Sequence, residues 1–421
     1  NENRKPLIIR GARQVGKTWI MKTFGQQYFE KTAYVNFDNN ARMKQVFEGD
    51  LDIERLVLSI SAETGVSIEA ENTLIIFDEV QEVPKALTSL KYFYENAPQY
   101  AIVAAGSLLG VALHQGTSFP VGKVDFLDLY PLNFREFLCA MGEKQFVSML
   151  DSCDTQMVTV FKTKYIERLR EYYFVGGMPE VVKDFSEKKD YNRVRAIQKN
   201  LINYYQQDFS KHAEIKLVPR LNLVWNSIPM QLAKENKKYI YGQVREGSRA
   251  KDFELAIQWL LDCGLIHKVQ RIQKPDLPLK AYIDFDAFKL FLVDIGLLIA
   301  MTDLDAKVII EGNKIFTEFK GALTEQYILQ QLISDVGVIP YYYSTQNSKG
   351  EIDFLVQGKT SVIPIEVKAE ENLKAKSLKA FCEKYQPSYA VRTSMSDYRE
   401  QDWMTNIPLY AIKWIENYVN Q

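Results

Sequence analysis

The chain has 421 residues, of which 47% are hydrophobic and 25% charged, and its formal net charge is −1 at pH 7. This length allows roughly two to four domains, and the near-zero charge disfavours a protein that coats nucleic acid. The four cysteines and three histidines are scattered, which disfavours a zinc site, a disulfide scaffold or a histidine nucleophile. Since no secretory signal or bilayer-spanning run is present, we expect a cytoplasmic protein without a membrane partner. The first residue is Asn1 rather than methionine, so we expect that an upstream segment has been lost or removed.

A nucleotide-binding motif follows the first apolar run. Residues 6–10 (PLIIR) predict a buried strand, residues 11–18 (GARQVGKT) fit G-x-x-x-x-G-K-[ST], and a helix is expected from residue 19. The two motif glycines allow a tight turn whose N–H groups point at phosphate oxygens. The lysine should reach the β- and γ-phosphates, and the threonine hydroxyl should bind Mg²⁺. The predicted phosphate-binding residues are Gly11, Ala12, Arg13, Gln14, Val15, Gly16, Lys17 and Thr18.

A second acidic motif follows at a fitting distance. Residues 33–38 predict a strand and residues 42–64 have helical spacing, after which residues 73–79 (TLIIFDE) give four apolar residues followed by two acids. A buried parallel strand has such a continuous apolar run, and its carboxyl end opens on the ligand crevice. Asp78 is therefore expected to hold Mg²⁺, usually through water, and Glu79 to polarise the attacking water.

A third strand is predicted at residues 100–105 and ends at Ser107. A polar residue at this position lies beside the γ-phosphate in many P-loop folds, so Ser107 is a candidate sensor. It is equally compatible with a helix N-cap or a turn serine, and the sequence leaves both interpretations open.

These motifs together resemble a known family. GARQVGKT, IIFDEVQ, AGSLL, LYPLNFREFL (129–138) and GGMPE (176–180) are similar to those of a group of prokaryotic AAA-family ATPases with a C-terminal domain of uncharacterised function. The resemblance covers nearly the whole chain. It implies an AAA+-like or STAND-like core followed by a helical lid, with the 176–179 turn near the nucleotide, and it favours ATP over GTP. The role of Arg13 stays open between phosphate contact and packing. The candidates for an arginine finger are Arg135, Arg168 and Arg170, each also compatible with a surface or lid position.

The middle of the chain predicts a winged helix-turn-helix, which the resemblance supports. Residues 217–232 and 252–263 have helical spacing, residues 237–241 form a short β-like run, and residues 264–269 predict a strand. A recognition helix is expected near residues 248–261. The basic residues near its start would contact DNA phosphates, although such domains also serve packing or protein contacts alone. These basic residues are Arg245, Arg249 and Lys251.

The C-terminal part predicts a second site. A helix at 314–334, strands at 340–344, 351–356 and 362–368, a helix at 373–385 and a strand at 389–393 follow the α-β-β-β-α-β order of the PD-(D/E)XK nuclease core.

In this order, Glu366 and Lys368 point to one face of their strand, and Asp353 can meet them from the neighbouring strand. With Glu325 from the helix, they form a candidate oxygen-rich site for Mg²⁺ or Mn²⁺. The metal would activate water, and Lys368 would orient the water or neutralise the transition state. Such acids are also compatible with a solvated strand face, and such folds with DNA binding alone.

We therefore predict an α/β protein with a P-loop NTPase parallel sheet. Its domains are expected to be an ATPase core (1–125), a helical lid (126–205), a winged helix-turn-helix (206–285) and a restriction-endonuclease-like domain (286–421). The expected function is ATP binding and hydrolysis that controls a DNA-binding, metal-dependent phosphodiesterase. The alternative is a nucleotide-dependent switch or scaffold that binds nucleic acid or protein without cleavage. ATP and Mg²⁺ are the expected cofactors and DNA is a candidate partner, while the oligomeric state is left open.

Overall fold

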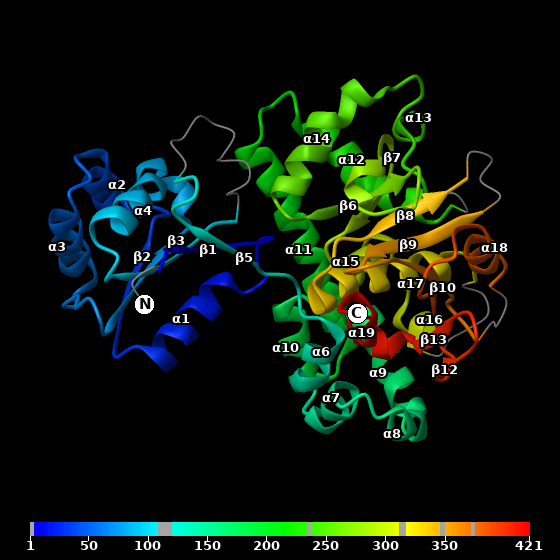
Figure 1. Cartoon of the computed structure of the whole chain (residues 1–421). Coiled ribbons are helices and arrows are strands. Elements are labelled where there is room, and N and C mark those ends of the chain that lie inside the picture. The colour runs from blue at the N-terminus through cyan, green and yellow to red at the C-terminus, as the bar shows by residue number, and fades with distance from the viewer. Residues whose placement is uncertain (1–3, 108–119, 235–236, 311–316, 346–349, 372–374) are drawn as a thin grey trace. The chain divides into compact units, whose positions relative to one another are not determined.

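The computed structural model describes residues 4–107, 120–234, 237–310, 317–345, 350–371 and 375–421 (Figure 1). The chain divides into two compact units. The first contains the chain up to Tyr130 together with Gln258–Leu265, and the second contains Pro131–Ile257 together with Ile266–Gln421. Within the described residues, no helix combines the length and the apolarity needed to cross a bilayer.

The first unit is built on a parallel sheet of five strands in the order β2-β3-β4-β1-β5. Strands β3 and β4 are buried along their whole length, which explains their continuous apolar sequence. The strands are β1 (Leu7–Arg10), β2 (Lys31–Asn36), β3 (Thr73–Asp78), β4 (Ala101–Ala105) and β5 (Asp125–Asp128).

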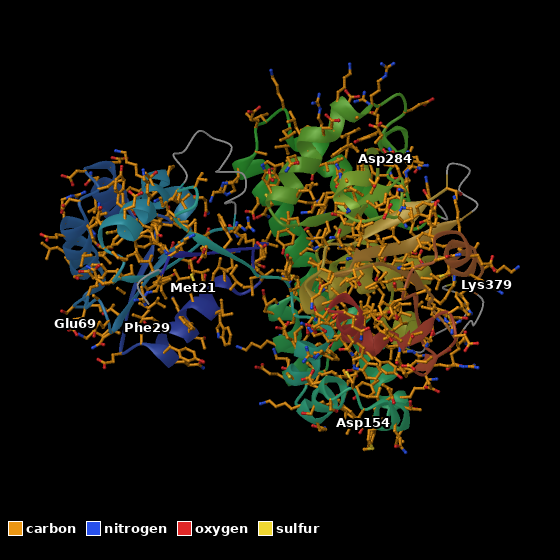
Figure 2. All side chains as sticks on the ribbon, in the orientation of Figure 1. Met21, Phe29, Glu69, Asp154, Asp284 and Lys379 are labelled. Atoms are coloured by element: carbon orange, nitrogen blue, oxygen red, sulfur yellow. The ribbon has the colours of Figure 1, made fainter. Side chains whose placement is uncertain are left out.

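Helices cover both faces of this sheet. Alternate strand residues enter two separate apolar clusters, one with Ile75 and Phe77 and the other with Leu74 and Ile76, because successive side chains of a strand point to opposite faces. Met21 of α1, labelled in Figure 2, belongs to the second cluster. The helices are α1 (Lys17–Tyr28), α2 (Ala41–Glu48), α3 (Ile53–Thr64) and α4 (Pro84–Asn96), with the short turn η1 (Val80–Glu82).

The second unit combines helices with a mixed sheet in the order β12-β13-β11-β10-β9-β8-β6-β7. Strands β10, β11 and β13 run parallel, and β9 pairs antiparallel with both β8 and β10. The strands are β6 (Ile266–Ile272), β7 (Ile283–Leu292), β8 (Tyr341–Ser344), β9 (Glu351–Gln357), β10 (Val362–Val367), β11 (Val391–Ser394), β12 (Arg399–Glu400) and β13 (Thr405–Pro408).

The helices that precede this sheet in the chain are α6 (Phe134–Ala140), α7 (Lys144–Asp151), α8 (Thr155–Val160), α9 (Lys162–Val175), α10 (Pro179–Lys188), α11 (Tyr191–His212), α12 (Val218–Leu232), α13 (Tyr241–Val244) and α14 (Ala250–Asp262). The later helices and turns are η2 (Leu279–Tyr282), α15 (Ile295–Met301), α16 (Ala306–Ile310), α17 (Thr317–Gln331), η4 (Leu332–Val336), α18 (Lys376–Tyr385), η5 (Leu409–Ile415) and α19 (Glu416–Val419).

The mixed α/β class and the parallel P-loop sheet are confirmed. The order α17-β8-β9-β10-α18-β11 follows the expected α-β-β-β-α-β succession. The expected β-like run at 237–241 is wrong, since Tyr239 and Ile240 lie in no strand and α13 begins at Tyr241. The amide of Tyr239 instead donates to the carbonyl of Phe288 at 2.8 Å, and the amide of Ile240 donates to Gln231 Oε1 at 3.2 Å.

The strand predicted at residues 264–269 corresponds to β6, which pairs antiparallel with β7 but also pairs in parallel with β8. The pair therefore belongs to the C-terminal sheet. The expected boundary at residue 285 falls inside β7. The winged helix and the four-domain division stay predictions.

The glycine pair of the GGMPE motif has a packing reason. A Cβ on Gly176, whose φ is +73°, would lie 2.2 Å from Asp294 Oδ1, and one on Gly177 would lie 2.1 Å from the carbonyl oxygen of Leu132. The amide of Gly177 donates to Asp294 Oδ2 at 2.6 Å, and the amide of Leu297 donates to Oδ1 at 3.1 Å. Only glycines permit these approaches. The expected position of this turn near the nucleotide stays a prediction.

Candidate functional site

The loop between β1 and α1 has the conformation of a phosphate cradle. Its backbone turns through positive φ angles at Gly11 (141°), Gln14 (65°) and Gly16 (96°). A Cβ at Gly11 would lie 2.1 Å from the carbonyl oxygen of Leu129, so no larger residue fits. The loop ends where α1 begins, and amide groups at a helix start attract anions.

The other predicted loop residues divide by burial and charge. Ala12 and Val15 are buried and anchor the loop, while Gln14 is exposed. Arg13 is a nearby positive charge that helps to lower the pKa of Lys17. Its direct role stays open between phosphate contact and packing.

Lys17 bridges the loop from the inside. Its ammonium donates to the carbonyl of Gly11 at 2.9 Å and to that of Ala12 at 2.8 Å, and the residue is only 7% exposed. Burial lowers the pKa of Lys17 from 10.5 to about 8, although the charges of Glu79 and Asp78 oppose this shift. The lysine is therefore a poorly solvated cation for which a phosphate group would be a favourable partner.

Asp78 ends β3 opposite the helix that carries the threonine. The Thr18 hydroxyl donates to Asp78 Oδ2 at 2.7 Å, and the amide of Glu79 donates to Asp78 Oδ1 at 3.1 Å. Two hard oxygen donors at the end of a phosphate-binding loop fit the needs of Mg²⁺, which usually takes one or two protein ligands together with substrate phosphates. Thr18 and Asp78 are thus the residues that would hold the ion.

Glu79 is held by two side chains. It adopts φ +50°, Gln81 Nε2 donates to its Oε2 at 2.6 Å, and the Ser107 hydroxyl donates to the same oxygen at 3.3 Å. The structure therefore brings Ser107 to the acid expected to polarise water, while its role as a γ-phosphate sensor stays a prediction. Sequence reasoning missed Gln81, although its position two residues after Glu79 was a usable signal.

Two of the three candidate arginine fingers are engaged within the second unit. Arg135 pairs with Asp151 and Asp335. Arg168 binds Glu143 at 2.6 Å and Glu171 at 2.8 Å. These contacts explain both arginines structurally, and an arginine-finger role stays a prediction.

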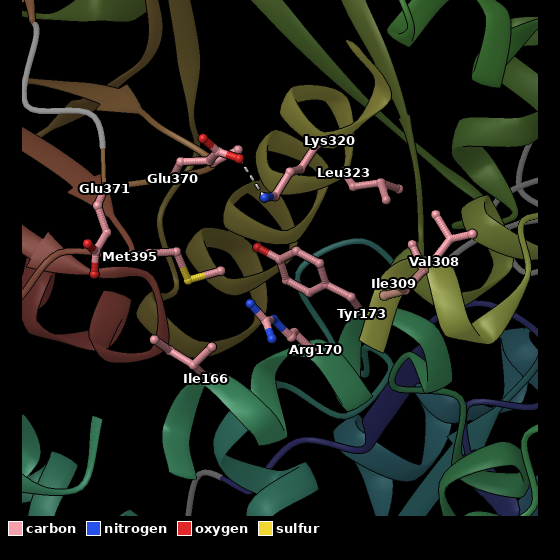
Figure 3. A pocket seen from close by; sticks show the side chains of 11 residues that line it. Ile166, Arg170, Tyr173, Val308, Ile309, Lys320, Leu323, Glu370, Glu371 and Met395 are labelled. Carbon is pink, nitrogen blue, oxygen red and sulfur yellow. Dashed lines mark hydrogen bonds and ion pairs between the residues drawn. The ribbon is translucent and has the colours of Figure 1, made fainter. Parts of the chain in front are cut away.

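The third candidate, Arg170, lines a cavity of about 360 Å³ (Figure 3). Its Nη1 donates to the carbonyl of Ile310 at 3.4 Å. The cavity lies beyond the carboxyl ends of β10 and β11 and is bounded by α9, α16 and α17. Lys320 pairs with Glu370 at its edge at 2.9 Å. The described residues that line it include none of the predicted C-terminal site residues.

The predicted helix glutamate and strand aspartate of the C-terminal site lie together, but with two lysines. Lys237 pairs with Glu325, and Lys289 Nζ lies 3.6 Å from Glu325 Oε2. Lys289 is fully buried on β7 and also pairs with Glu351. The sequence did not reveal either lysine, because both lie far from Asp353 along the chain.

The two buried acids, Glu325 and Asp353, differ in how their surroundings shift their pKa values. Burial, reinforced by Glu325, raises the pKa of Asp353 to about 8 against the opposing effect of the lysines. Burial also opposes ionisation of Glu325, but Lys237 and Lys289 outweigh it and lower the pKa of Glu325. The surroundings therefore favour the charged form of Glu325 over the charged form of Asp353.

Glu366 and Lys368 pair with each other at the end of β10. Lys368 Nζ lies 2.6 Å from Glu366 Oε1, and Glu366 Oε2 accepts the amide of Leu378 at 3.0 Å. Asp353 reaches the same strand end, where its Oδ2 accepts the amide of Val367 at 2.7 Å. The expected neighbourhood of Asp353 with the Glu366–Lys368 strand is thus present.

The acidic side chains of this cluster are engaged by protein groups in this arrangement. Glu325 faces Lys237 and Lys289, and Asp353 accepts the amide of Val367. Glu366 accepts the amide of Leu378 and pairs with Lys368. Over the described ranges, no three His, Cys, Asp or Glu side chains are placed to hold a metal ion. The predicted metal ligands Glu325, Asp353 and Glu366 therefore meet protein donors here.

Of the basic residues expected to face DNA, Arg245 caps the C-terminal end of α13, while Arg249 and Lys251 lie at the start of α14. Arg245, Arg249 and Lys251 are exposed, and the amide of Arg249 donates to Asp252 Oδ2 at 2.8 Å. Exposure leaves them able to meet phosphates, but contact with DNA stays a prediction.

Comparisons with known proteins divide the chain in three. Residues 3–138 match the family model of an AAA domain, and residues 166–308 and 320–412 match two domains of unknown function, DUF8612 and DUF4143. No curated protein matches the chain.

Two solved structures show a distant likeness. The Walker-type ATPase of Pyrococcus abyssi has 13% identity and a TM-score of 0.43, over 71% of this chain and 91% of that one. The Drosophila ORC bound to DNA has 12% identity and a TM-score of 0.25, over 69% and 88%. Neither likeness bears on function at these TM-scores. The family match and the geometry of the loop agree, and residues 3–138 are a P-loop ATPase domain of the AAA type.

Proposed function

We propose that the N-terminal unit binds and hydrolyses ATP in the presence of Mg²⁺. The contact between Thr18 and Asp78, 2.7 Å long and beside the buried Lys17, carries this proposal. Mg²⁺ bound by these two residues would neutralise charge on the phosphates. Lys17 exchanges its two carbonyl acceptors for phosphate oxygens, and the start of α1 contributes amide donors to the same anion.

Glu79 is the proposed general base or water-orienting group. Its Oε2 accepts from Gln81 and Ser107, which fixes the carboxylate in a position from which it could accept a hydrogen bond from the attacking water. Its backbone has a positive φ, which is uncommon outside glycine and is often stored at functional sites.

Three substitutions test this assignment. We expect Lys17→Ala to abolish ATP binding, because the buried cation for the phosphates is lost, and Glu79→Gln to bind ATP but not to hydrolyse it. Glu82→Gln is the matched control, since Glu82 lies on the same turn but pairs with Lys44 at 3.9 Å. The measurements are binding of a fluorescent ATP analogue and phosphate release. Normal turnover by Lys17→Ala would refute the assignment.

For the C-terminal module, we propose that it binds nucleic acid or protein under control of the nucleotide state, without cleaving it. The buried ammonium of Lys289 supports this proposal, because together with Lys237 it supplies the positive charge that Glu325 would otherwise share with a metal. A nucleotide-dependent change in binding of DNA or of a protein partner, measured with ATP and with ADP, is the expected result.

Phosphodiester cleavage is the second candidate. The pair formed by Lys368 and Glu366, with Asp353 at the adjacent amide, favours it. The test is cleavage of plasmid and single-stranded DNA with Mg²⁺ or Mn²⁺, with and without ATP, for the wild type, Asp353→Ala and Lys368→Ala. Lys379→Ala, at an exposed position of α18 (Figure 2), is the control. Cleavage by the wild type and the control that is lost in Asp353→Ala and Lys368→Ala would establish a nuclease. DNA binding by the wild type without cleavage would support the binding function instead.

A further inference from the structure

Tyr34 reaches the magnesium-binding end of the ATPase site from the neighbouring strand. Strand β2 pairs in parallel with β3, with Tyr34 in register with Ile76, two residues before Asp78. From this position the Tyr34 hydroxyl donates to Asp78 Oδ2 at 2.9 Å. The P-loop and the acidic strand motif contain no signal for this contact, because it depends on the order of strands in the sheet.

The two oxygens of Asp78 are held by three donors. Oδ2 accepts the hydroxyls of both Thr18 and Tyr34, and Oδ1 accepts the amide of Glu79 at 3.1 Å. A carboxylate at a strand end can otherwise rotate about its side-chain bonds. The Tyr34 hydroxyl therefore restricts the orientations that Asp78 can adopt.

The tyrosine ring is itself fixed from α1. The ammonium of Lys22 lies 3.7 Å from the centroid of the Tyr34 ring, a cation–π contact. Lys22 follows Thr18 by four residues, about one helical turn, so both side chains of α1 face the same strands.

We propose that Tyr34 is a positioning residue that holds Asp78 in the orientation needed to bind ATP together with Mg²⁺. The inference rests on the proposed ATPase function. Tyr34 does not meet the nucleotide in this scheme. Tyr34 acts through Asp78. Loss of its hydroxyl therefore weakens the contribution of the metal to ATP binding, while the contacts of the loop with the phosphates, which do not need the metal, are unchanged.

The test compares ATP affinity with and without the metal. We expect Tyr34→Phe to raise the Kd for a fluorescent ATP analogue about tenfold in Mg²⁺, since a hydrogen bond to a charged acceptor is lost. The Kd in EDTA should be unchanged, and the Mg²⁺ concentration for half-maximal hydrolysis should rise. Tyr28→Phe, on the same unit but 70% exposed, is the matched control and should behave as the wild type in both conditions.

A second variant keeps the test decisive if Tyr34→Phe does not fold. Lys22→Gln frees the ring but keeps the hydroxyl, and we expect a smaller loss of affinity that again depends on Mg²⁺. Equal Kd values for Tyr34→Phe and the wild type in Mg²⁺ would overturn the proposal, as would an equal loss in Mg²⁺ and in EDTA, which indicates a general structural role. Either result would leave the ATPase assignment in place if Lys17→Ala has lost ATP binding. Failure of the Tyr34 proposal can therefore be distinguished from failure of the ATPase proposal.

Discussion

The nucleotide-free protein should become more stable as the pH rises above neutrality, because Lys17 is buried as a cation. Burial lowers its pKa from 10.5 to about 8. Between these two values the unfolded chain binds more protons than the folded chain, so the free energy of unfolding increases with pH in that window. For a single group with these pKa values, the gain between about pH 7.5 and about pH 9.5 is roughly 2 kcal/mol. Lys17 is 7% exposed, so solvent screening reduces this value little.

The assay is thermal unfolding of the wild type and of Lys17→Met without nucleotide at both pH values. The gain applies to the N-terminal unit, whose transition is identified by its upward shift with ATP. Relative to the variant, the wild type should gain roughly 4–8 °C at the higher pH. Other titrating groups are present in both proteins, so the difference isolates Lys17.

Saturating ATP with Mg²⁺ provides an internal control. A bound phosphate keeps Lys17 charged, so the gain in stability with pH should disappear in its presence. Parallel pH profiles for the nucleotide-free wild type and Lys17→Met would refute the reasoning, since they would mean that the ammonium is solvated as well in the folded chain as in the unfolded one.

Two further substitutions, with a third as a control, test the packing of the second unit, and all are measured by urea unfolding. Gly176→Ala should cost at least about 2 kcal/mol because its Cβ would meet Asp294 Oδ1 at 2.2 Å. Gly142→Ala, at a similar φ of +82° but with nothing within 4 Å, should cost only about 1 kcal/mol, and equal costs would contradict the packing explanation. Lys289→Met should cost about 3–5 kcal/mol by leaving Glu325 buried without this cation. A neutral result would show that Lys237 or water compensates.

The ATPase site was predictable where its residues are consecutive. The loop at 11–18 and the strand ending at Asp78 each carry a local pattern whose chemistry is visible without the fold. Tyr34 was not predictable, because its partner depends on β2 lying beside β3.

The C-terminal site shows the same limit. The order of helices and strands was visible in the hydrophobic pattern, and Glu366 with Lys368 followed from strand alternation. Lys289 was hidden, because it lies within an apolar strand and meets Glu325 only through tertiary packing. The β-like composition at 237–241 was misleading. The amide of Tyr239 donates to the carbonyl of Phe288 in β7, but residues 239 and 240 do not themselves form a strand.

The pairing of β6 with β8 limits how this chain can be rearranged during evolution. A recombination event at residue 285 would divide β7, whose pairing with β6 extends from Ile283 to Leu292. The recipient would inherit a sheet edge with unpaired amide and carbonyl groups, which invites association with other chains. A transferred C-terminal module would therefore keep β8 paired on both sides only if residues 266–292 travelled with it.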